Sequence, residues 1–158
     1  MTDLEVRTAL DDYHALALTI FGEARGEPIE GKVFVGSVIR NRVKRPKRYG
    51  DTYARVCLAR AQFSCWWQAG GKANFDLVMA KARLVVDADH VDRASTPSDA
   101  ALEECRWVAS GILSGALGDR ALGATHYITR ALWRSAPPEW AKGQTPSVEV
   151  GSHVGFRL

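Results

Sequence analysis

Apolar residues recur at spacings of three and four through most of the first 115 residues of this 158-residue chain, and no other feature constrains its fold as strongly. Leu10, Ala17, Leu18 and Phe21 form one such set. This spacing places apolar side chains on one face of an α-helix, so it predicts helices over about residues 4–24, 28–45, 52–59, 75–88 and 97–114. The aromatic segment between the third and fourth helices is expected to be mostly irregular.

Prolines and capping residues set the expected ends of these helices. Pro28 cannot continue the first helix, but it suits the first position of the second, which ends before Pro46. Thr96 is expected to cap the fifth helix, with Pro97 at its first position and Asp99 at its third.

After residue 118 the sequence changes character. The segments “GATHYIT” (123–129) and “VEVGSHVGFRL” (148–158) are short, rich in residues that favour strands, and bounded by glycine. They predict a small strand pair or hairpin, or a loop platform, packed against the helices. The fold class is therefore α+β and mostly α, and the absence of linkers and repeats predicts one domain over residues 1–158.

Charge and cysteine content argue against several classes of protein. The net charge of +3 is compatible with an anionic polymer as partner but too small to demand nucleic acid. The three cysteines have neither the even count of a disulfide framework nor the spacing of a zinc site, so we expect free thiols, no metal and no cofactor. Cys57 and Cys105 fall in apolar helical patterns and are expected in the core.

The N-terminal segment “MTDLEVRTALDDYH” is acidic where a signal peptide would be basic and then apolar. No apolar run approaches the roughly 20 residues of a membrane span. We therefore expect a monomer that is made in the cytoplasm without a signal peptide and does not insert into a membrane.

The stretch “FGEARGEPIEG” (21–31) carries three glutamates beside glycines and a proline. Glu23 falls on the last turn of the first predicted helix, where the macrodipole disfavours an anion. The dipole, and any burial, favour a neutral carboxylic acid there, and such a group can donate a proton. Glu27 lies beside Pro28, where it suits capping of the second helix, and Glu30 falls in a first turn that favours negative charge. Spacing alone leaves open whether Glu23 has a function or is an exposed residue at a fraying helix end.

The segment “LTIFGEARGEPIEGKVFVGSVIRNRV” (18–43) resembles the opening of the SleB-type cell-wall hydrolases, the family of spore-cortex lytic enzymes. Their pattern runs E-A-R-G-E, a short gap, G, an apolar helix and then N-R-V. Three further blocks follow in the family's order: “QFS” (62–64), “GATHY” (123–127) and “VGSHVGF” (150–156). The resemblance spans nearly the whole chain, although two adjacent tryptophans in “CWWQAGGKANF” (65–75) depart from the pattern.

This resemblance implies a lysozyme-like helical fold, peptidoglycan as the partner, and cleavage of its glycan strands between N-acetylmuramic acid and N-acetylglucosamine. It also implies lytic transglycosylase chemistry, in which the first glutamate of E-A-R-G-E, Glu23 here, is the catalytic acid. The glutamate protonates the glycosidic oxygen and then takes the proton of the muramic acid 6-hydroxyl, which attacks its own anomeric carbon. One carboxyl group suffices, whereas ordinary glycosidases use two that lie about 5 to 10 Å apart.

Binding a polysaccharide requires polar groups for its hydroxyls and acetamides and flat aromatic rings beneath its pyranose rings. Candidates of both kinds occur after residue 60, and they are Gln62, Ser64, Trp66, Tyr127, His126 and His153. A loop position for the first two favours a binding role. Core packing explains the tryptophan as well as sugar stacking does, and the two histidines suit structural hydrogen bonding as well as orientation of the acid or of a sugar hydroxyl.

Several alternatives stay open. The reaction could be plain hydrolysis by a muramidase, with Glu27, or Asp51 in the loop before the third helix, as the second carboxylate. The chain could be a non-enzymatic wall-binding phage structural protein that keeps the fold. It could also be a basic nucleic-acid binder using “RNRVKRPKR” (40–48), although it carries no motif of such a fold.

The biological setting is also an expectation. A compact chain of this kind is expected to be a bacteriophage endolysin, made in the host cytoplasm and released through a holin pore to act on the cell wall in the periplasm. A bacterial or prophage-encoded hydrolase is the alternative.

Overall fold

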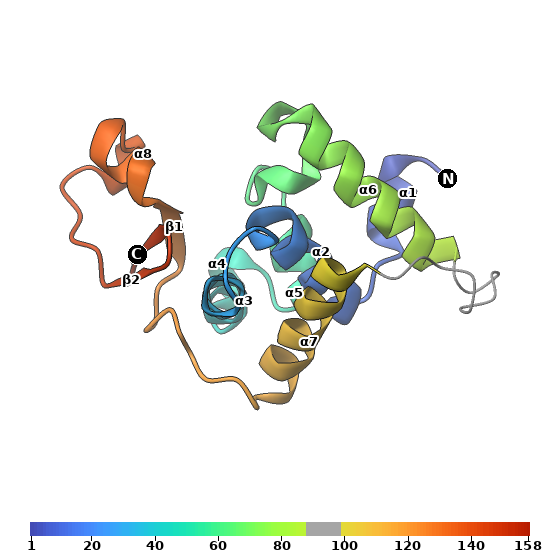
Figure 1. Ribbon diagram of the computed structural model, residues 1–158, viewed down its shortest axis with the longest axis horizontal. Helices are drawn as coiled ribbons and strands as arrows, with labels where there is room; N and C mark the ends of the chain where they lie inside the picture. The colour runs from blue at the N-terminus through green and yellow to red at the C-terminus, as the bar shows by residue number, and fades with distance from the viewer. Residues whose placement is uncertain (88–98) are drawn as a thin grey trace.

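The computed structural model describes residues 1–87 and 99–158, and Figure 1 shows a body of helices with a small sheet at one side. The helices of the body are α1 (Asp3–Thr8), α2 (Asp12–Ala24), α3 (Ile29–Val43), α4 (Pro46–Tyr49), α5 (Tyr53–Leu58), α6 (Lys72–Asp87) and α7 (Ala100–Ser114). The C-terminal part contains β1 (His126–Thr129), α8 (Arg130–Ser135), β2 (Val148–Val150) and β3 (His153–Phe156). The described residues also form the short 3-10 helices η1 (Ser64–Trp66), η2 (Gln68–Gly70) and η4 (Glu139–Ala141).

Helix α2 is the centre of the core. Every residue from Ala15 to Phe21 is buried, as expected for a helix that is surrounded on all sides. Helices α3, α5, α6 and α7 pack around it. One close approach is at Gly36 of α3, where an added Cβ would lie 3.0 Å from Ile112 of α7 and 3.3 Å from Ile20 of α2. The missing side chain therefore lets three helices meet tightly.

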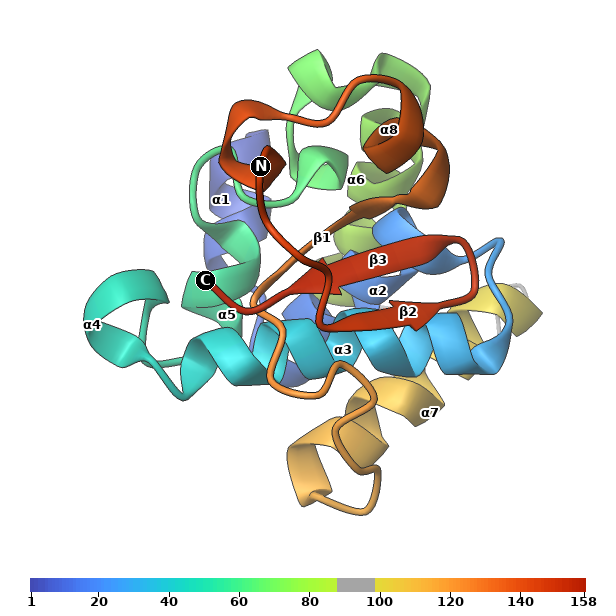
Figure 2. The ribbon, with the colours of Figure 1, turned by 90° about the vertical axis from the view of Figure 1, so that its left-hand side faces the viewer.

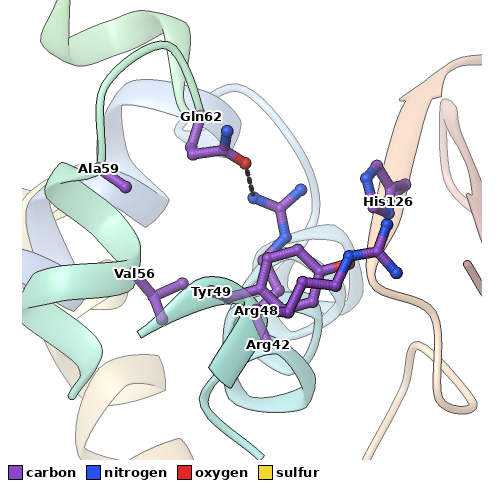
Figure 3. Close-up of a pocket in the computed structure, with 7 residues that line it drawn as sticks. All are labelled: Arg42, Arg48, Tyr49, Val56, Ala59, Gln62 and His126. Carbon is purple, nitrogen blue, oxygen red and sulfur yellow. Dashed lines mark hydrogen bonds between the residues drawn. The ribbon is translucent and has the colours of Figure 1, made fainter. Parts of the chain in front are cut away.

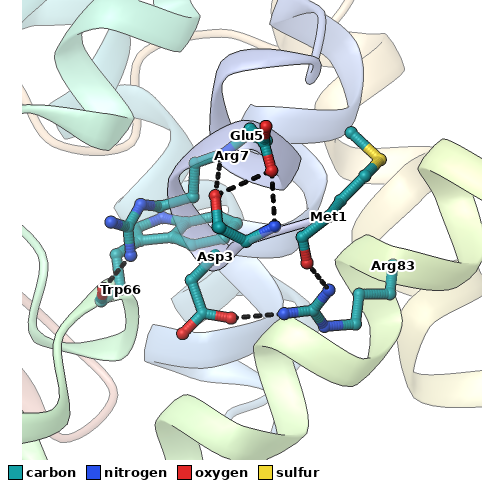
Figure 4. A network of polar contacts seen from close by, with 7 residues as sticks. Met1, Asp3, Glu5, Arg7, Trp66 and Arg83 are labelled. Carbon is teal, nitrogen blue, oxygen red and sulfur yellow. Dashed lines mark hydrogen bonds and ion pairs between the residues drawn. The ribbon is translucent and has the colours of Figure 1, made fainter.

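The prediction of one helix over residues 4–24 is wrong, because the structure divides it into α1 and α2. Asp11 caps α2 by accepting a hydrogen bond from the His14 backbone N–H at 2.8 Å, and Thr2 and Glu5 form a capping box on α1. Figure 4 shows that Arg83 of α6 holds this N-terminal segment through the Met1 carbonyl and Asp3. Arg7 in turn donates to the Trp66 carbonyl at 3.2 Å, which ties α1 to η1.

The ends of the other helices agree with the predictions to within a few residues. Pro28 is the N-cap of α3, one position before its predicted place, and α3 ends before Pro46 as predicted. The helix predicted over residues 75–88 is α6, which begins three residues earlier, at Lys72. The predicted cap Thr96 and Pro97 lie outside the described residues; α7 begins at Ala100.

Two further details of the helices differ from the predictions. Asp99 is the N-cap of α7 and not its third residue, since its carboxylate accepts the Leu102 N–H at 3.1 Å. The one-turn helix α4 was not predicted, because it is too short to show a periodic pattern.

The C-terminal segments form a three-stranded antiparallel sheet in the order β1-β3-β2, in place of the predicted strand pair or loop platform. The segment 148–158 supplies two of these strands because it turns back on itself at Gly151, which has a positive φ of 57°. Figure 2 shows β2 and β3 running alongside α3. Tyr127 of β1 pairs with Gly155 of β3, and Thr129 pairs with His153.

The core also contains the cysteines. Cys57, Cys65 and Cys105 are buried with free thiols, which confirms the predicted core positions of Cys57 and Cys105. Within residues 1–87 and 99–158, no helix combines the length and the apolar character needed to span a membrane.

Candidate active site

Glu23 lies on the last turn of α2, where the sequence predicted it, and its half-buried carboxylate is the meeting point of three segments. The Tyr127 hydroxyl of β1 donates a hydrogen bond to Oε2 at 2.9 Å. The backbone N–H of Cys65 donates to Oε1 at 3.2 Å, and the Ser64 hydroxyl donates to the same oxygen at 3.4 Å. Both carboxylate oxygens are thus held in position by groups that are about 40 and 100 residues away along the chain.

These partners can serve a carboxyl group in either protonation state. A hydroxyl can donate or accept a hydrogen bond, whereas a backbone N–H can only donate. Oε1 is therefore fixed as an acceptor by Cys65, while Oε2 beside the Tyr127 hydroxyl can be ionised or can carry a proton. Burial, and then the neighbouring Glu23 carboxylate, raise the pKa of Tyr127 well above its ordinary value, so its phenol keeps its proton. The site can both release a proton and take one up.

The loop that carries Ser64 and Cys65 lies directly against the last turn of α2. A Cβ added at Gly22 would lie 2.4 Å from the Cys65 Cβ, so only glycine permits this approach. Asn74 of α6 donates to the Gly22 carbonyl at 3.0 Å, which satisfies one of the free carbonyls at the end of α2. Arg25 donates to the Asn74 side chain and fixes it.

Glu27 lies in the turn after α2, with its backbone N–H bonded to the Ala24 carbonyl at 2.9 Å. The prediction that it caps α3 is wrong, because α3 has no side-chain cap and the Glu27 carboxylate faces the turn between β2 and β3. There it accepts a hydrogen bond from the Ser152 hydroxyl. Its side chain is 19% exposed, and Oε1 lies 3.6 Å from Nδ1 of His153.

His153 lies between the environments of the two glutamates. Its ring stacks on Phe34 with centroids 5.9 Å apart and meets the Tyr127 ring edge-on at 5.2 Å. Its Nδ1 is buried and has no hydrogen-bond partner among the described residues. Burial lowers the pKa of His153, while Glu27 and then Glu23 act in the opposite direction. The imidazole is therefore neutral at pH 7, with Nδ1 directed near Glu27.

Gln62 and His126 belong to a neighbouring pocket and not to the hydrogen-bonding shell of Glu23. Gln62 accepts a hydrogen bond from Arg42 at 3.0 Å (Figure 3). His126 directly precedes Tyr127 on β1, and successive side chains of a strand point to opposite faces. His126 accordingly contacts Tyr49 and Trp140, away from the acid.

The expectation that Trp66 contacts a sugar is wrong. The side chain is fully buried, and its indole N–H donates to the Thr19 hydroxyl of α2 at 2.8 Å. The core interpretation of this residue is the correct one. In residues 1–87 and 99–158, no group of three or more His, Cys, Asp or Glu side chains is placed to hold a metal ion.

Sequence reasoning missed three contributors to the site. The Cys65 N–H is a backbone donor, so the identity of the residue gave no signal. Ser152 directly precedes His153 in the block “VGSHVGF”, which could have indicated it. Asn74 does not contact Glu23 but donates a hydrogen bond to the Gly22 carbonyl at the end of α2, and nothing in its sequence neighbourhood indicated that contact.

Comparison with known proteins adds to this geometry. A family model described as Cell Wall Hydrolase matches residues 26–156. The structure is similar to the catalytic domain of the germination-specific lytic transglycosylase SleB from Bacillus anthracis, with a TM-score of 0.59 and 22% identity over 92% of this chain and 93% of that chain.

The catalytic domain of the Bacillus cereus SleB protein is also similar, with a TM-score of 0.55 and 22% identity over 92% of this chain and 89% of that chain. No curated protein matches the chain. These likenesses confirm the predicted fold class, a mostly helical, lysozyme-like α+β domain.

Proposed function

The chain belongs to the cell wall hydrolase family, and from this premise we propose that it cleaves the glycan strands of peptidoglycan between N-acetylmuramic acid and N-acetylglucosamine, with Glu23 as general acid. One observation carries the proposal: the Tyr127 hydroxyl from β1, and the Ser64 hydroxyl and Cys65 N–H from η1, converge on the Glu23 carboxylate. A glutamate with only a structural role at an exposed helix end would not need three such partners.

The proposed reaction needs no second carboxylate. Glu23 donates its proton to the glycosidic oxygen as the bond from that oxygen to the anomeric carbon breaks. The 6-hydroxyl of the same muramic acid then bonds to the anomeric carbon and gives its proton to the Glu23 carboxylate. The product is a 1,6-anhydro ring, the acid is regenerated, and no water is consumed. Because nucleophile and electrophile belong to one sugar, the attack gains a high effective molarity.

Hydrolysis is the second candidate, and the position of Glu27 favours it. The Glu27 carboxylate is held by Ser152 and lies beside His153, whose ring also touches Tyr127. A carboxylate in this position could act as the base that activates a water molecule. The two candidates differ in the origin of the nucleophile, and this can be measured.

The test is digestion of peptidoglycan sacculi in oxygen-18 water, followed by mass spectrometry of the released muropeptides. Transglycosylation predicts 1,6-anhydromuramic ends that are lighter by one water than hydrolysis products and carry no label. Labelled reducing ends would show hydrolysis instead. Absence of any glycan cleavage would refute the proposed function.

Matched variants separate the roles of the acids. Glu23→Gln is expected to fold normally and to lose about a hundredfold to ten-thousandfold in kcat, because an amide cannot donate the proton. Glu30→Gln is the control, since it removes the same charge from an exposed position on α3. Glu27→Gln is expected to cost far less than Glu23→Gln if the nucleophile comes from the sugar. If Glu27→Gln proves the more damaging change, the two roles must be exchanged.

We extend the proposal to lysis of a host cell from within, as the sequence predicts. Co-expression with a pore-forming holin tests this role. Lysis that requires both proteins supports it, and lysis without the holin contradicts the proposed route to the wall.

A further inference from the structure

A second pocket lies next to the Glu23 site, and its residues have no part in the mechanism above. It is a cavity of about 320 Å³ between α4, α5 with its following loop, and β1 (Figure 3). It is lined by Arg42, Arg48, Tyr49, Val56, Ala59, Gln62 and His126. Among the described residues, no Asp or Glu contributes to this lining, so the pocket is positively charged.

The pocket is close enough to the acid to bind another part of the same substrate. Gln62 at its rim is two residues before Ser64, which contacts Glu23. Two residues of extended chain span at most about 7 Å. His126 on its far side directly precedes Tyr127, the other partner of Glu23. The two sites therefore share the loop before η1 and the strand β1.

Arg42 is buried and held in one orientation. Its Nε donates to the Thr125 carbonyl at 2.7 Å and a terminal nitrogen donates to the Gln62 side-chain oxygen at 3.0 Å. Its guanidinium carbon lies over the rings of Tyr49 and Phe63, 5.3 and 5.0 Å from their centroids. A guanidinium has five N–H donors, so these bonds leave donors for a ligand. Because the Gln62 oxygen faces Arg42, the amide N–H₂ of Gln62 is also left to donate.

Arg48 supplies a second, more accessible charge. Its exposed guanidinium lies over the Tyr49 ring at 5.1 Å, and it makes no hydrogen bond or ion pair within the part of the chain that the structure describes. Arg45 differs, because it donates to the Leu158 carbonyl. Burial, and then Arg42, Arg48 and Arg45, lower the pKa of His126 to about 4, so this imidazole is neutral at pH 7.

We propose that this pocket binds a carboxylate of the peptide stem that the muramic acid carries, and this inference rests on the proposed function. The sugar rings of a peptidoglycan strand are uncharged, whereas the stem attached to the lactyl group carries carboxylates. A planar guanidinium matches a carboxylate with two parallel hydrogen bonds. The pocket would thus select muramic acid residues that carry a peptide and would place them against Glu23.

The kinetic test compares Arg48→Gln with Lys47→Gln on two substrates. Lys47 is exposed on the same helix and does not line the pocket, so it is a control with the same change in charge. The substrates are glycan strands that carry their peptides and the same strands after the carboxylates of their peptides have been converted to amides. Arg48→Gln is expected to raise KM about tenfold on the first substrate, the cost of one charge-assisted hydrogen bond, with kcat unchanged. On the amidated strands it is expected to match the wild type, and Lys47→Gln is expected to match the wild type on both substrates.

Equal effects of Arg48→Gln on both substrates, or equal effects of the two variants, would overturn the assignment. If neither substrate is cleaved by the wild type, the proposed function fails, and the pocket is then tested by binding alone. For that purpose the NMR signal of the His126 imidazole is titrated in the Glu23→Gln variant with the dipeptide L-alanyl-γ-D-glutamate.

A bound carboxylate offsets the arginines, so the pKa of His126 is expected to rise by one unit or more with the dipeptide. The same peptide with its carboxylates converted to amides is expected to leave this pKa unchanged. No shift with the acidic dipeptide would overturn the proposal. Inorganic phosphate could shift the pKa of His126 as much as the dipeptide does, and Arg48→Gln could change KM equally on the two strand substrates. These two results together would show a general anion site and would overturn the assignment to the peptide stem.

Discussion

Tyr127→Phe is the sharpest test of the geometry around Glu23, because it removes one hydrogen bond and little else. The lost bond is the 2.9 Å contact from the phenol to Glu23 Oε2. The ring itself stays in place, since it packs edge-on against Phe34 at 5.8 Å and His153 at 5.2 Å. Phenylalanine keeps both contacts and nearly the same volume.

The expected magnitude follows from the strength of this bond. A hydrogen bond to a charged group contributes about 1.5 to 3 kcal/mol. The Glu23 side chain is half-buried, so water can partly replace the phenol, and the lower end of this range applies. A loss of about 1.5 kcal/mol in the transition state lowers kcat about tenfold. The free energy of unfolding is expected to change by less than about 1 kcal/mol, because packing is kept and no buried donor is left without a partner.

The assay measures kcat and KM on purified glycan strands, together with urea denaturation of each variant. Tyr53→Phe is the control, because Tyr53 lies on α5 and its hydroxyl makes no hydrogen bond with any residue that the structure describes. A kcat within twofold of wild type would show that the phenol does not position the acid. A loss above about a thousandfold in a folded variant would show that the phenol itself transfers a proton, and the reasoning above would then be wrong.

Three further predictions follow from the packing and the titrating groups. Gly22→Ala would place a methyl group 2.4 Å from the Cys65 Cβ. We expect urea denaturation to show a free energy of unfolding that is lower by about 1 to 3 kcal/mol, and kcat to fall because the Cys65 N–H moves away from Glu23. Wild-type stability and kcat would contradict this contact. Folding lowers the pKa of His126 from 6.5 to about 4. Between these two pH values the unfolded chain carries a proton on this imidazole and the folded chain does not. The free energy of unfolding is therefore expected to decrease as the pH falls from 6.5 towards 4. Because this ring is half exposed, we expect only about 1 kcal/mol, and His126→Asn should remove that part of the pH dependence of urea denaturation. Burial raises the pKa of Cys57 and Cys105 to about 12, and all three cysteines are buried. An aromatic disulfide reagent at pH 8 is therefore expected to label no thiol in the folded protein and all three after unfolding. Rapid labelling of the folded protein, or a lower Tm in the presence of a reductant, would contradict this.

The sequence predicted the helices well because their packing is periodic. A stripe of apolar side chains is a direct consequence of burying one face, so each long helix is visible without any knowledge of its neighbours. The break between α1 and α2 was missed because the apolar pattern continues across residues 9–11, whereas the caps that separate the helices are local hydrogen bonds. The third strand was missed for a related reason, since β2 and β3 are too short to be told apart from one strand by composition.

The site was less predictable because it is built from distant segments. The family resemblance singled out Glu23, Ser64 and Tyr127, and the structure brings these three together. Their distances could not be predicted, because they depend on how η1 and β1 pack on α2. The opposite outcome for Trp66 shows the same limit, since within one 3-10 turn Ser64 contacts Glu23 whereas Trp66 is buried in the core.

Gly155 of β3 helps to set the position of the sheet relative to Glu23. Tyr127 pairs with Gly155 across β1 and β3, so the position of β3 sets the position of the phenol. An added Cβ at Gly155 would lie 2.8 Å from Val148, 3.0 Å from Ala124 and 3.1 Å from the Phe34 ring. The absence of a side chain therefore lets β3 lie directly on α3, and this contact carries Tyr127 to within hydrogen-bonding distance of Glu23. Strand β1 also carries His126, which lines the cationic pocket. The packing of β3 on α3 therefore also fixes the distance between this pocket and Glu23. A substrate that occupies both the pocket and the Glu23 site must match this distance.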